Sequence, residues 1–341
     1  MKTTDFAKYL TSFLGQYLPV ECGVSKNTIT TYSYTFTLLI QYFSTVENIA
    51  PEHLTLETLT YQRITGFLDW IESERICSIA TRTARLGCLH SFFNYLQYNN
   101  VQGLAQWQRL RSIKSKRIAA PEMAYLDVEA TKQLLKQPDL HTKKGRRNFA
   151  LIGLMYDSAC RVQEIIDLTP SCLRFDTTTT LVINGKGNKT RIVPLDSSQV
   201  HNLRQYMTEA DLLNPINSQR PLFPNPQGGK LSRMAVLNII KKYADMARAQ
   251  TPEHFPNDIG CHTLRHSKAM HMLEAGINLV WIRDFLGHSS TTTTEIYARA
   301  SSKMKEDALA KLDPGILKKK KSSWQNNKEL LSYLKSLQTK Y

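Results

Sequence analysis

Apolar positions recur at helical spacing through the first part of the chain. Within residues 25–43, the side chains Ile29, Tyr32, Phe36, Leu39 and Phe43 follow one another at alternating steps of three and four. This spacing places them on one face of an amphipathic helix, which Ser25 or Asn27 can cap. Two further segments carry the same pattern, with apolar stripes at Ile64, Phe67, Leu68 and Ile71 and at Leu86, Leu89, Phe93 and Leu96. The sequence therefore predicts a small helical bundle over residues 1–108.

The second part of the chain has a mixed pattern. Residues 146–168 predict two helices with a break at 157–159. Two β-prone runs, 179–183 and 190–195, flank a glycine-rich tip and predict a β-hairpin. From Cys261 the spacing is again helical, and Pro314 with Gly315 predicts its end. We therefore expect a mostly α fold with a small β-sheet or hairpin, in which residues 123–313 form a second, α+β domain.

Basic residues gather between these two parts. Residues 109–122 predict an interdomain linker, and their charge suggests that it lies along nucleic acid. Its cations are Arg109, Arg111, Lys114, Lys116 and Arg117. In the third predicted helix, Arg82 and Arg85 fall off the apolar stripe, as they would in a helix that contacts a phosphate backbone. A face that is merely solvated would have the same pattern.

Composition supports a polyanionic partner. The chain has 341 residues, is 42% hydrophobic and carries a formal net charge of +15, so we expect a folded protein with a basic surface that binds nucleic acid. We find no signal peptide and no apolar run of about 18 residues, which argues against a membrane partner and predicts a cytoplasmic, nucleoid-associated protein. The six cysteines show no C-x-x-C spacing and are interpreted as reduced thiols.

Several residues could carry chemistry. His262 and Arg265 are three apart at a helix start, so both project from one face and could bind a phosphate. Arg161 begins a predicted helix with Glu164 one turn later, and Lys186 lies at the hairpin tip. An ordinary surface ion pair and a solubilising tip lysine are the alternative interpretations of these positions.

Metal and nucleotide chemistry are not favoured by the motifs. His262 and His266 have the spacing of zinc ligands on a helix, but no glutamate follows His262 and no remote cluster supplies a third ligand. We therefore expect a structural role for His266 and for His271. The Gly-Lys-Gly tip lacks the spacing of a P-loop, so we expect no metal, no ATP and no other cofactor.

The order of these residues carries a family resemblance. Arg161, Lys186, His262 with Arg265, His288 and Tyr297 lie in the motifs ACRVQEIIDL, NGKGNKTRIVPL, CHTLRHSKAMHMLEAG and LGHSSTTTTEIYA. The segments SKNTITTYSYTF and TARLGCLHSFFNYL support them. Over roughly residues 6–312 the chain resembles the tyrosine recombinase, or phage integrase, family, and it looks closest to bacterial integrases of mobile elements. The resemblance implies a helical, SAM-like core-binding domain and an α+β catalytic domain that form a C-shaped clamp on DNA.

The resemblance also implies a chemistry. Tyr297 would attack a DNA phosphodiester and form a 3′-phosphotyrosine, while Arg161, Arg265 and His288 stabilise the transition state. Lys186 would protonate the leaving 5′-oxygen, His262 would assist proton transfer at the tyrosine, and Glu164 would orient Arg161. The chain departs from the common pattern at Cys261, where many members have proline, and at Lys268, which replaces an aromatic or small residue.

The implied partners are double-stranded DNA with a specific recombination site, a homotetramer on two such sites, and accessory proteins that set direction. Strand exchange would pass through a Holliday junction and integrate or excise a mobile element. Residues 314–341 form a basic tail in which Leu330, Leu331, Leu334 and Leu337 predict one apolar helical face. The resemblance implies that this helix docks on a neighbouring subunit, and packing on its own domain is the alternative.

Three other functions are left open by the sequence. A helical bundle with a basic linker also suits a DNA-binding regulator that lacks catalysis. A metal-dependent nuclease could be built on His262 and His266. A type IB topoisomerase would share the tyrosine chemistry but not the sequence specificity. No motif in the chain encodes a target sequence, because base readout depends on which side chains enter a groove.

Overall fold

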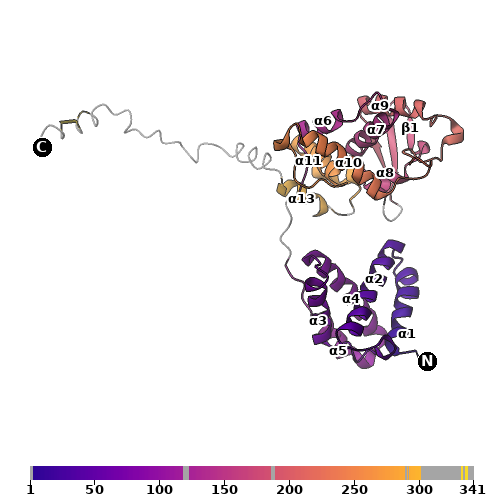
Figure 1. The fold of residues 1–341 in the computed structure, drawn as a ribbon, viewed down its shortest axis with the longest axis vertical. Helices are drawn as coiled ribbons and strands as arrows, with labels where there is room; N and C mark the ends of the chain where they lie inside the picture. Colours follow the sequence, from indigo (N-terminus) through magenta and orange to yellow (C-terminus); the bar gives the residue numbers. More distant parts are fainter. Residues whose placement is uncertain are drawn as a thin grey trace. The chain divides into compact units, whose positions relative to one another are not determined.

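In the computed structural model the chain forms two compact units, Met1–Pro121 and Glu122–Tyr341 (Figure 1). The structure describes residues 3–117, 123–185, 189–288, 290, 292–300, 332, 335 and 336. Each unit has its own hydrophobic core. No helix in the described part of the chain is long and apolar enough to cross a membrane.

The first unit is the predicted helical bundle. Its α-helices are α1 (Asp5–Ser12), α2 (Lys26–Thr45), α3 (Tyr61–Ser73), α4 (Ile79–Asn99) and α5 (Leu104–Arg111), and a π-helical segment, Phe13–Glu21, follows α1. Ser25, Thr60 and Ser78 cap α2, α3 and α4 by accepting a hydrogen bond from a backbone N–H of the first turn. The predicted cap at Ser25 is thereby confirmed.

Aromatic rings form the centre of this bundle. Phe92 of α4 lies with its ring centroid 5.1 Å from that of Phe13 and 5.1 Å from that of Phe36 of α2, in edge-on arrangements that aromatic pairs prefer. All three side chains are buried. The packing therefore ties the π-helical segment and α2 to α4.

The bundle extends further along the chain than the sequence predicts. We expected the linker to begin at residue 109, but α5 continues through Arg111, and Leu110 and Ile113 are buried in the core of the first unit. The two apolar side chains anchor this stretch in spite of the basic residues around them. Residues 118–122 of the predicted linker lie outside the described residues.

The second unit is helical with a small sheet. Its helices are α6 (Val128–Lys136), α7 (Lys143–Asp157), α8 (Val162–Asp167), α9 (Ser197–Glu209), α10 (Arg233–Arg248), α11 (Thr263–Glu274), α12 (Leu279–Leu286) and α13 (Thr292–Ala300), and its strands are β1 (Leu173–Phe175), β2 (Thr179–Asn184) and β3 (Thr190–Pro194). The buried helix α7 packs against α9 and α11, and α10 packs against α6 and α8. The expected fold class, mostly α with a small β-sheet, is confirmed.

The sheet contains the predicted hairpin. Its order is β1-β2-β3, and both neighbouring pairs are antiparallel, with Asn184 opposite Thr190 at the turn end of the β2–β3 pair. Leu181 and Ile183 of β2 are buried on one face, as the period of two in a strand requires. The short strand β1 is an addition that the sequence did not predict. Lys186 lies outside the described residues.

Two left-handed backbone positions shape the surroundings of the site. The predicted break at 157–159 is present, because α7 ends at Asp157 and Ala159 adopts φ +48° before α8 begins. Gly287 ends α12 with φ +65°, the conformation that favours glycine after a helix.

The predicted end of the helical region and the predicted tail helix lie outside the described residues. This concerns Pro314, Gly315, Leu330, Leu331, Leu334 and Leu337.

Candidate active site

Arg161 and Glu164 form a reciprocal pair at the start of α8. Arg161 is the N-cap residue, and its backbone N–H donates to Oε2 of Glu164 over 2.8 Å. The Nη1 atom of the same arginine donates to Oε1 over 2.8 Å. The glutamate therefore holds both the backbone and the guanidinium of Arg161, and the helix start leaves that guanidinium facing the end of α12.

Arg191 of β3 completes this pair from the sheet. Its Nη1 and Nη2 donate to the two oxygens of Glu164 over 3.1 Å and 2.7 Å. Burial alone would raise the pKa of Glu164, but hydrogen bonds from Arg191 and from the backbone N–H of Arg161 outweigh it and lower that pKa to about 2. The carboxylate is therefore charged at neutral pH, and it links α8 to the hairpin.

Arg265 of α11 lies beside this cluster and is 3% exposed. Its Nη1 donates to the carbonyl of Ala159 over 2.7 Å and its Nη2 to the carbonyl of Leu286 over 2.6 Å. Arg161 donates to the next carbonyl, that of Gly287, over 3.4 Å. Burial, and then the positive charges of Arg161 and Arg191, lower the pKa of Arg265 to about 10. Both guanidiniums thus converge on the end of α12.

Tyr297 of α13 is buried, with 1% of its surface exposed. Its hydroxyl lies 3.0 Å from Nδ1 of His266. Burial raises the pKa of Tyr297, while the nearby charges of Arg265 and Arg161 lower it. The phenol is therefore protonated at neutral pH, and a neighbouring imidazole can accept its proton.

Histidines surround the tyrosine. The ring of His288 is stacked on that of Tyr297, with 6.5 Å between centroids and 5° between planes, and its Nδ1 lies 3.0 Å from Oγ1 of Thr294. Burial lowers the pKa of both His266 and His288 to about 4, assisted in each by nearby cations, including Arg265. The two imidazoles are thus neutral at pH 7.

His262 lies one turn before His266. It occupies the N-cap position of α11, and its ring centroid is 6.1 Å from that of His266. Burial, and then the charges of Arg265 and Arg161, lower its pKa. His262 therefore belongs to the same cluster, but His266 is the histidine in hydrogen-bond contact with the tyrosine.

A cleft of about 910 Å³ opens beside these groups. Arg161, Arg191 and His288 line it together with Lys189, and Trp281 lies on its apolar side. The cleft is therefore basic where the two arginines and His288 meet, which suits a phosphate group.

The structure brings together most of the residues predicted from the sequence, and it adds two. Arg161, Glu164, His262, Arg265, His288 and Tyr297 form one cluster in the second unit. The two additions are His266, to which we assigned a structural role, and Arg191, which we did not single out. The only advance signals were the four-residue step from His262 to His266 and the position of Arg191 in the motif NGKGNKTRIVPL.

Neither His262 nor His266 belongs to a group that could bind a metal. Among the described residues, no three histidine, cysteine, aspartate or glutamate side chains gather as metal ligands would. His271, the other histidine of α11 assigned a structural role, has its Nδ1 2.9 Å from the hydroxyl of Tyr156. It packs on the side of α7.

Arg82, which the sequence placed off the apolar stripe as a possible phosphate contact, is buried rather than part of a solvated face. Arg82 is only 5% exposed, and its guanidinium lies 3.3 Å from Asp69 and 3.1 Å from Glu72. These two carboxylates are three residues apart on α3, so they form a paired anionic site facing α4. The charge of Arg82 serves the packing of α3 on α4.

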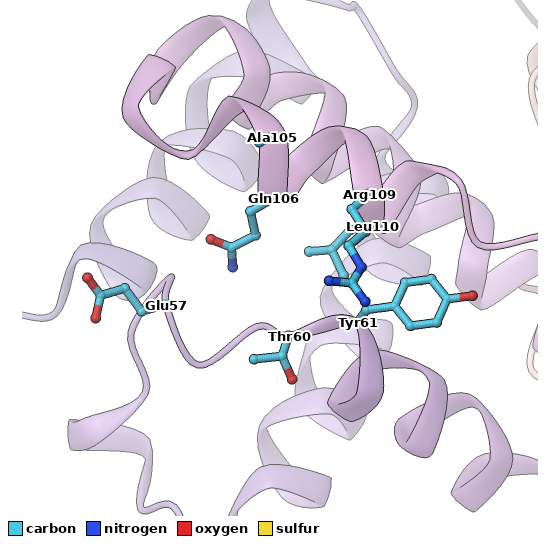
Figure 2. A pocket seen from close by; sticks show the side chains of 7 residues that line it. All are labelled: Glu57, Thr60, Tyr61, Ala105, Gln106, Arg109 and Leu110. Atoms are coloured by element: carbon cyan, nitrogen blue, oxygen red, sulfur yellow. The ribbon is translucent and has the colours of Figure 1, made fainter.

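The other predicted DNA contacts lie nearer the surface. Arg85 donates to Oγ1 of Thr35 over 3.0 Å and lies 4.8 Å from the ring centre of Tyr34. Figure 2 shows Arg109 beside Tyr61 at a pocket of about 390 Å³, where the guanidinium lies 5.4 Å from the ring centre. Thr35 and Tyr34 therefore hold Arg85 in place, and Tyr61 holds Arg109.

The basic residues at the end of α5 and directly after it are exposed. Arg111 donates to Gln97 over 3.4 Å, and Lys116 pairs with Glu72 over 2.6 Å. Lys114 and Arg117 are exposed as well. This stretch offers positive charge at the surface of the first unit.

The arrangement in the second unit defines a class of site. Arg161, Arg265 and the neutral His288 can hold the oxygens of a phosphate. A tyrosine with an adjacent imidazole can act as a nucleophile. The site therefore combines a buried tyrosine, a neutral imidazole in contact with it and a cleft lined by arginines.

Comparison with known proteins agrees with this class. Residues 124–304 match the phage integrase family, and residues 10–100 match the phage integrase N-terminal SAM-like domain. The chain belongs to the phage integrase family, whose members are tyrosine recombinases that act in site-specific recombination.

Two relatives illustrate the extent of the similarity. A Sinorhizobium fredii protein named as an integrase/recombinase, y4rC, is 34% identical over 336 residues, which cover 98% of this chain and 99% of that protein. The tyrosine recombinase XerD of Listeria innocua is 29% identical over 87% of this chain and 96% of its own length. The similarity therefore spans both units.

Solved structures share the fold. The XerH site-specific recombinase bound to palindromic difH substrate has a TM-score of 0.67 at 22% identity, covering 83% of this chain and 79% of that chain. The Tn1549 transposon integrase in complex with circular intermediate DNA has a TM-score of 0.66 at 15% identity, covering 90% and 99%. At this identity the match concerns the fold alone.

Proposed function

We propose that the protein cuts and rejoins double-stranded DNA at a specific site through a covalent 3′-phosphotyrosine formed by Tyr297. The observation that carries the proposal is the placement of the tyrosine. Its hydroxyl is 3.0 Å from a neutral imidazole, and two cationic guanidiniums lie near enough to affect its pKa. Family membership adds the reaction class.

Each predicted residue receives a role in the proposed reaction. The Tyr297 oxygen bonds to phosphorus, the bond from phosphorus to the 5′-oxygen breaks, and Lys186 gives that oxygen a proton. Arg161, Arg265 and His288 hold the non-bridging oxygens as negative charge develops. Glu164 keeps Arg161 in orientation. The products are a phosphotyrosine and a 5′-hydroxyl.

The phenol proton has a nearby acceptor. His266 is the histidine in contact with Tyr297, and its neutral ring can take the proton at Nδ1 when its own proton is on Nε2. We infer that His262, one turn earlier with its ring centroid 6.1 Å from that of His266, assists this transfer. Rejoining reverses these steps, with a 5′-hydroxyl attacking the phosphotyrosine. One phosphodiester replaces another, so no ATP is consumed.

A movement of α13 precedes cleavage in this scheme. A tyrosine with 1% of its surface exposed cannot bond to a phosphate of a DNA duplex, whose width keeps it outside the protein core. Tyr297 must therefore leave its packed position after DNA binds. We infer that this step contributes to the cleavage rate, as conformational steps do in many enzymes.

The wider setting is inferred from the relatives. We infer that four protomers act on two DNA sites and that the reaction integrates or excises a mobile element, since a relative 34% identical over nearly the whole chain is named as an integrase/recombinase. A chain truncated after Leu317 should cleave but fail to assemble if the tail links subunits. A truncated chain that unfolds would instead support packing of the tail on its own domain.

The decisive test uses a library of duplexes with randomised sequence and a nick that lets the cleaved end diffuse away. We expect DNA to be retained covalently in detergent through its 3′ end, and sequencing of the retained strands to give one target. Chelation of metals should leave capture intact. Retention through a 5′ end, or cleavage without a covalent product, would contradict the proposal.

Two tyrosine variants complete this test. Tyr297→Phe should abolish capture while binding to the recovered DNA persists. Tyr206→Phe is the matched control, because Tyr206 is also buried in the second unit but its hydroxyl only donates to the carbonyl of Leu222. Capture by the Tyr297→Phe variant at the wild-type rate would exclude Tyr297 as the nucleophile. Relaxation of any supercoiled plasmid would favour a topoisomerase.

A further inference from the structure

The turn that carries Arg161 is buried and strained. Ala159 adopts φ +48°, a left-handed conformation that the Cβ of an alanine disfavours. Ser158, Ala159 and Cys160 have at most 1% of their surface exposed. The surrounding structure must therefore hold this turn in place, since its own backbone preference does not.

Helix α11 holds the turn at two points. Arg265 donates to the carbonyl of Ala159 over 2.7 Å, and Lys268 donates to Oδ1 of Asp157 over 3.0 Å. The two cations are three residues apart, so they lie on one face of α11. Arg265 contacts the strained residue itself, and Lys268 contacts the last residue of α7.

Asp157 is a fixed point for a third element. Its second oxygen, Oδ2, accepts a hydrogen bond of 2.8 Å from the backbone N–H of Asp196, the N-cap residue of α9. The aspartate is only 6% exposed, so its charge needs a partner. Arg265, the other cation on this face of α11, directs its Nη atoms to the carbonyls of Ala159 and Leu286 instead. Lys268 supplies the compensating charge.

Lys268 itself is placed by aromatic side chains. Its ammonium lies 5.1 Å from the ring centre of Tyr156 and 6.0 Å from that of Phe285, and its side chain is 22% exposed. Such rings attract a cation and limit where it can move. The lysine is therefore held over the end of α7, with Asp157 as its hydrogen-bond acceptor.

We propose that Lys268 and Asp157 are a positioning pair that holds the strained 158–161 turn against α11 and thereby fixes Arg161 relative to Arg265. The proposal rests on the proposed function, because it assigns the pair a role in the same phosphate site. Lys268 and Asp157 bind each other and do not touch the phosphate, which Arg161 and Arg265 bind. The pair therefore acts only through the position of the turn. Loss of the pair lets the turn relax, and the two guanidiniums no longer meet one phosphate.

The test compares cleavage rate with binding. Lys268→Met is made in the full chain and assayed on a nicked duplex of the sequence recovered from the library, with protein in excess and well below the melting temperature. We expect the covalent capture rate to fall by about tenfold or more, as small misplacements of catalytic groups do. The dissociation constant for DNA should change less than about threefold, since surface cations dominate affinity.

Three further variants separate positioning from folding. Lys268→Arg should retain capture because it keeps the charge. Ala159→Gly, combined with Lys268→Met, should recover part of the lost rate, since glycine removes the strain that the pair opposes. The matched control, Lys132→Met, breaks the exposed pair of Lys132 with Glu129 on α6 and should capture at the wild-type rate.

A modified substrate tests directly whether misplaced arginines slow the reaction. A methylphosphonate at the scissile position removes one negative charge, so the rate deficit of Lys268→Met should shrink on it if misplaced arginines cause the deficit. The inference is overturned if a folded Lys268→Met variant captures DNA at the wild-type rate, or if its deficit is the same on both substrates and Ala159→Gly recovers nothing. If the wild-type chain captures no DNA at all, the proposed function fails first.

Discussion

The hydroxyl of Tyr297 lies 3.0 Å from Nδ1 of His266, and no more than 1% of the tyrosine is exposed. The tyrosine thus rests against a neutral imidazole inside the second unit. A neutral imidazole at this distance is a stronger candidate for the base than His262, the histidine to which the family resemblance gave a role in this proton transfer.

Replacement of His266 by leucine should slow covalent capture while DNA binding persists. We expect a loss of about a hundredfold, the range for removal of a general base. Capture rates at saturating protein, with affinity measured in parallel on the Tyr297→Phe background, separate the two effects. A larger loss from His262→Leu than from His266→Leu would return the role of base to His262.

Glu164→Gln should destabilise the second unit. The change leaves two guanidiniums without their shared carboxylate, and removal of one partner from a buried pair costs about 3–5 kcal/mol. Denaturant unfolding followed by circular dichroism measures the loss. Glu209→Gln is the control, because its pair with Arg146 is more exposed, with side-chain exposures of 32% and 23%, and should cost about 1 kcal/mol or less. Equal losses in the two variants would show that the Glu164 cluster adds nothing.

The stability of the second unit should fall between pH 7 and pH 5. Burial and neighbouring cations lower the pKa of His266 and His288 to about 4, whereas histidine in an unfolded chain titrates near 6.5. Below that pH the unfolded chain binds protons that the folded chain does not, so the free energy of unfolding falls. Each histidine should contribute about 1 kcal/mol at pH 5, after allowance for partial exposure.

A His266→Gln/His288→Gln variant isolates this effect. Its free energy of unfolding should depend less on pH over the same range, and the difference from wild type is read from urea unfolding at pH 7, 6 and 5. An identical pH dependence in both proteins would mean that these two histidines titrate normally.

Arg82→Met and Lys114→Met should have opposite signatures. Arg82 is buried between two carboxylates, so its loss should lower the melting temperature of the first unit and leave the salt dependence of DNA binding unchanged. Lys114 is exposed, and if it contacts a phosphate its loss should reduce the slope of log K against log salt by about 1. Titrations at several salt concentrations decide this. A reduced slope for Arg82→Met would place that residue at the DNA after all.

Local patterns were sufficient for several elements of the fold, though not for β1. The apolar steps at Ile29, Phe36 and Phe43 predict α2, and the β-prone runs around Lys186 predict the β2–β3 hairpin, because both signals depend on neighbours along the chain. The same dependence on neighbours misplaced the start of the linker. The charges of Arg109 and Arg111 dominate the local sequence there, whereas the burial of Leu110 depends on residues far away in the chain.

Contacts between distant segments were beyond the sequence. Periodicity gave no sign that Arg82 meets α3, that Arg191 reaches Glu164 across 27 positions, or that His266 reaches Tyr297 across 31. A positive φ at Ala159 was equally hidden, since alanine gives no signal for it. The motif order located most of the site, but the partners that hold it are set by tertiary packing.

The buried position of Tyr297 has a consequence for how such a protein searches a chromosome. A basic surface meets many phosphates, and almost all of them belong to irrelevant sequence. If Tyr297 is the nucleophile, as we propose, its position inside the fold leaves those encounters harmless, because electrostatic attraction alone does not release it. The packing of one side chain, rather than weak binding, would then protect bystander DNA.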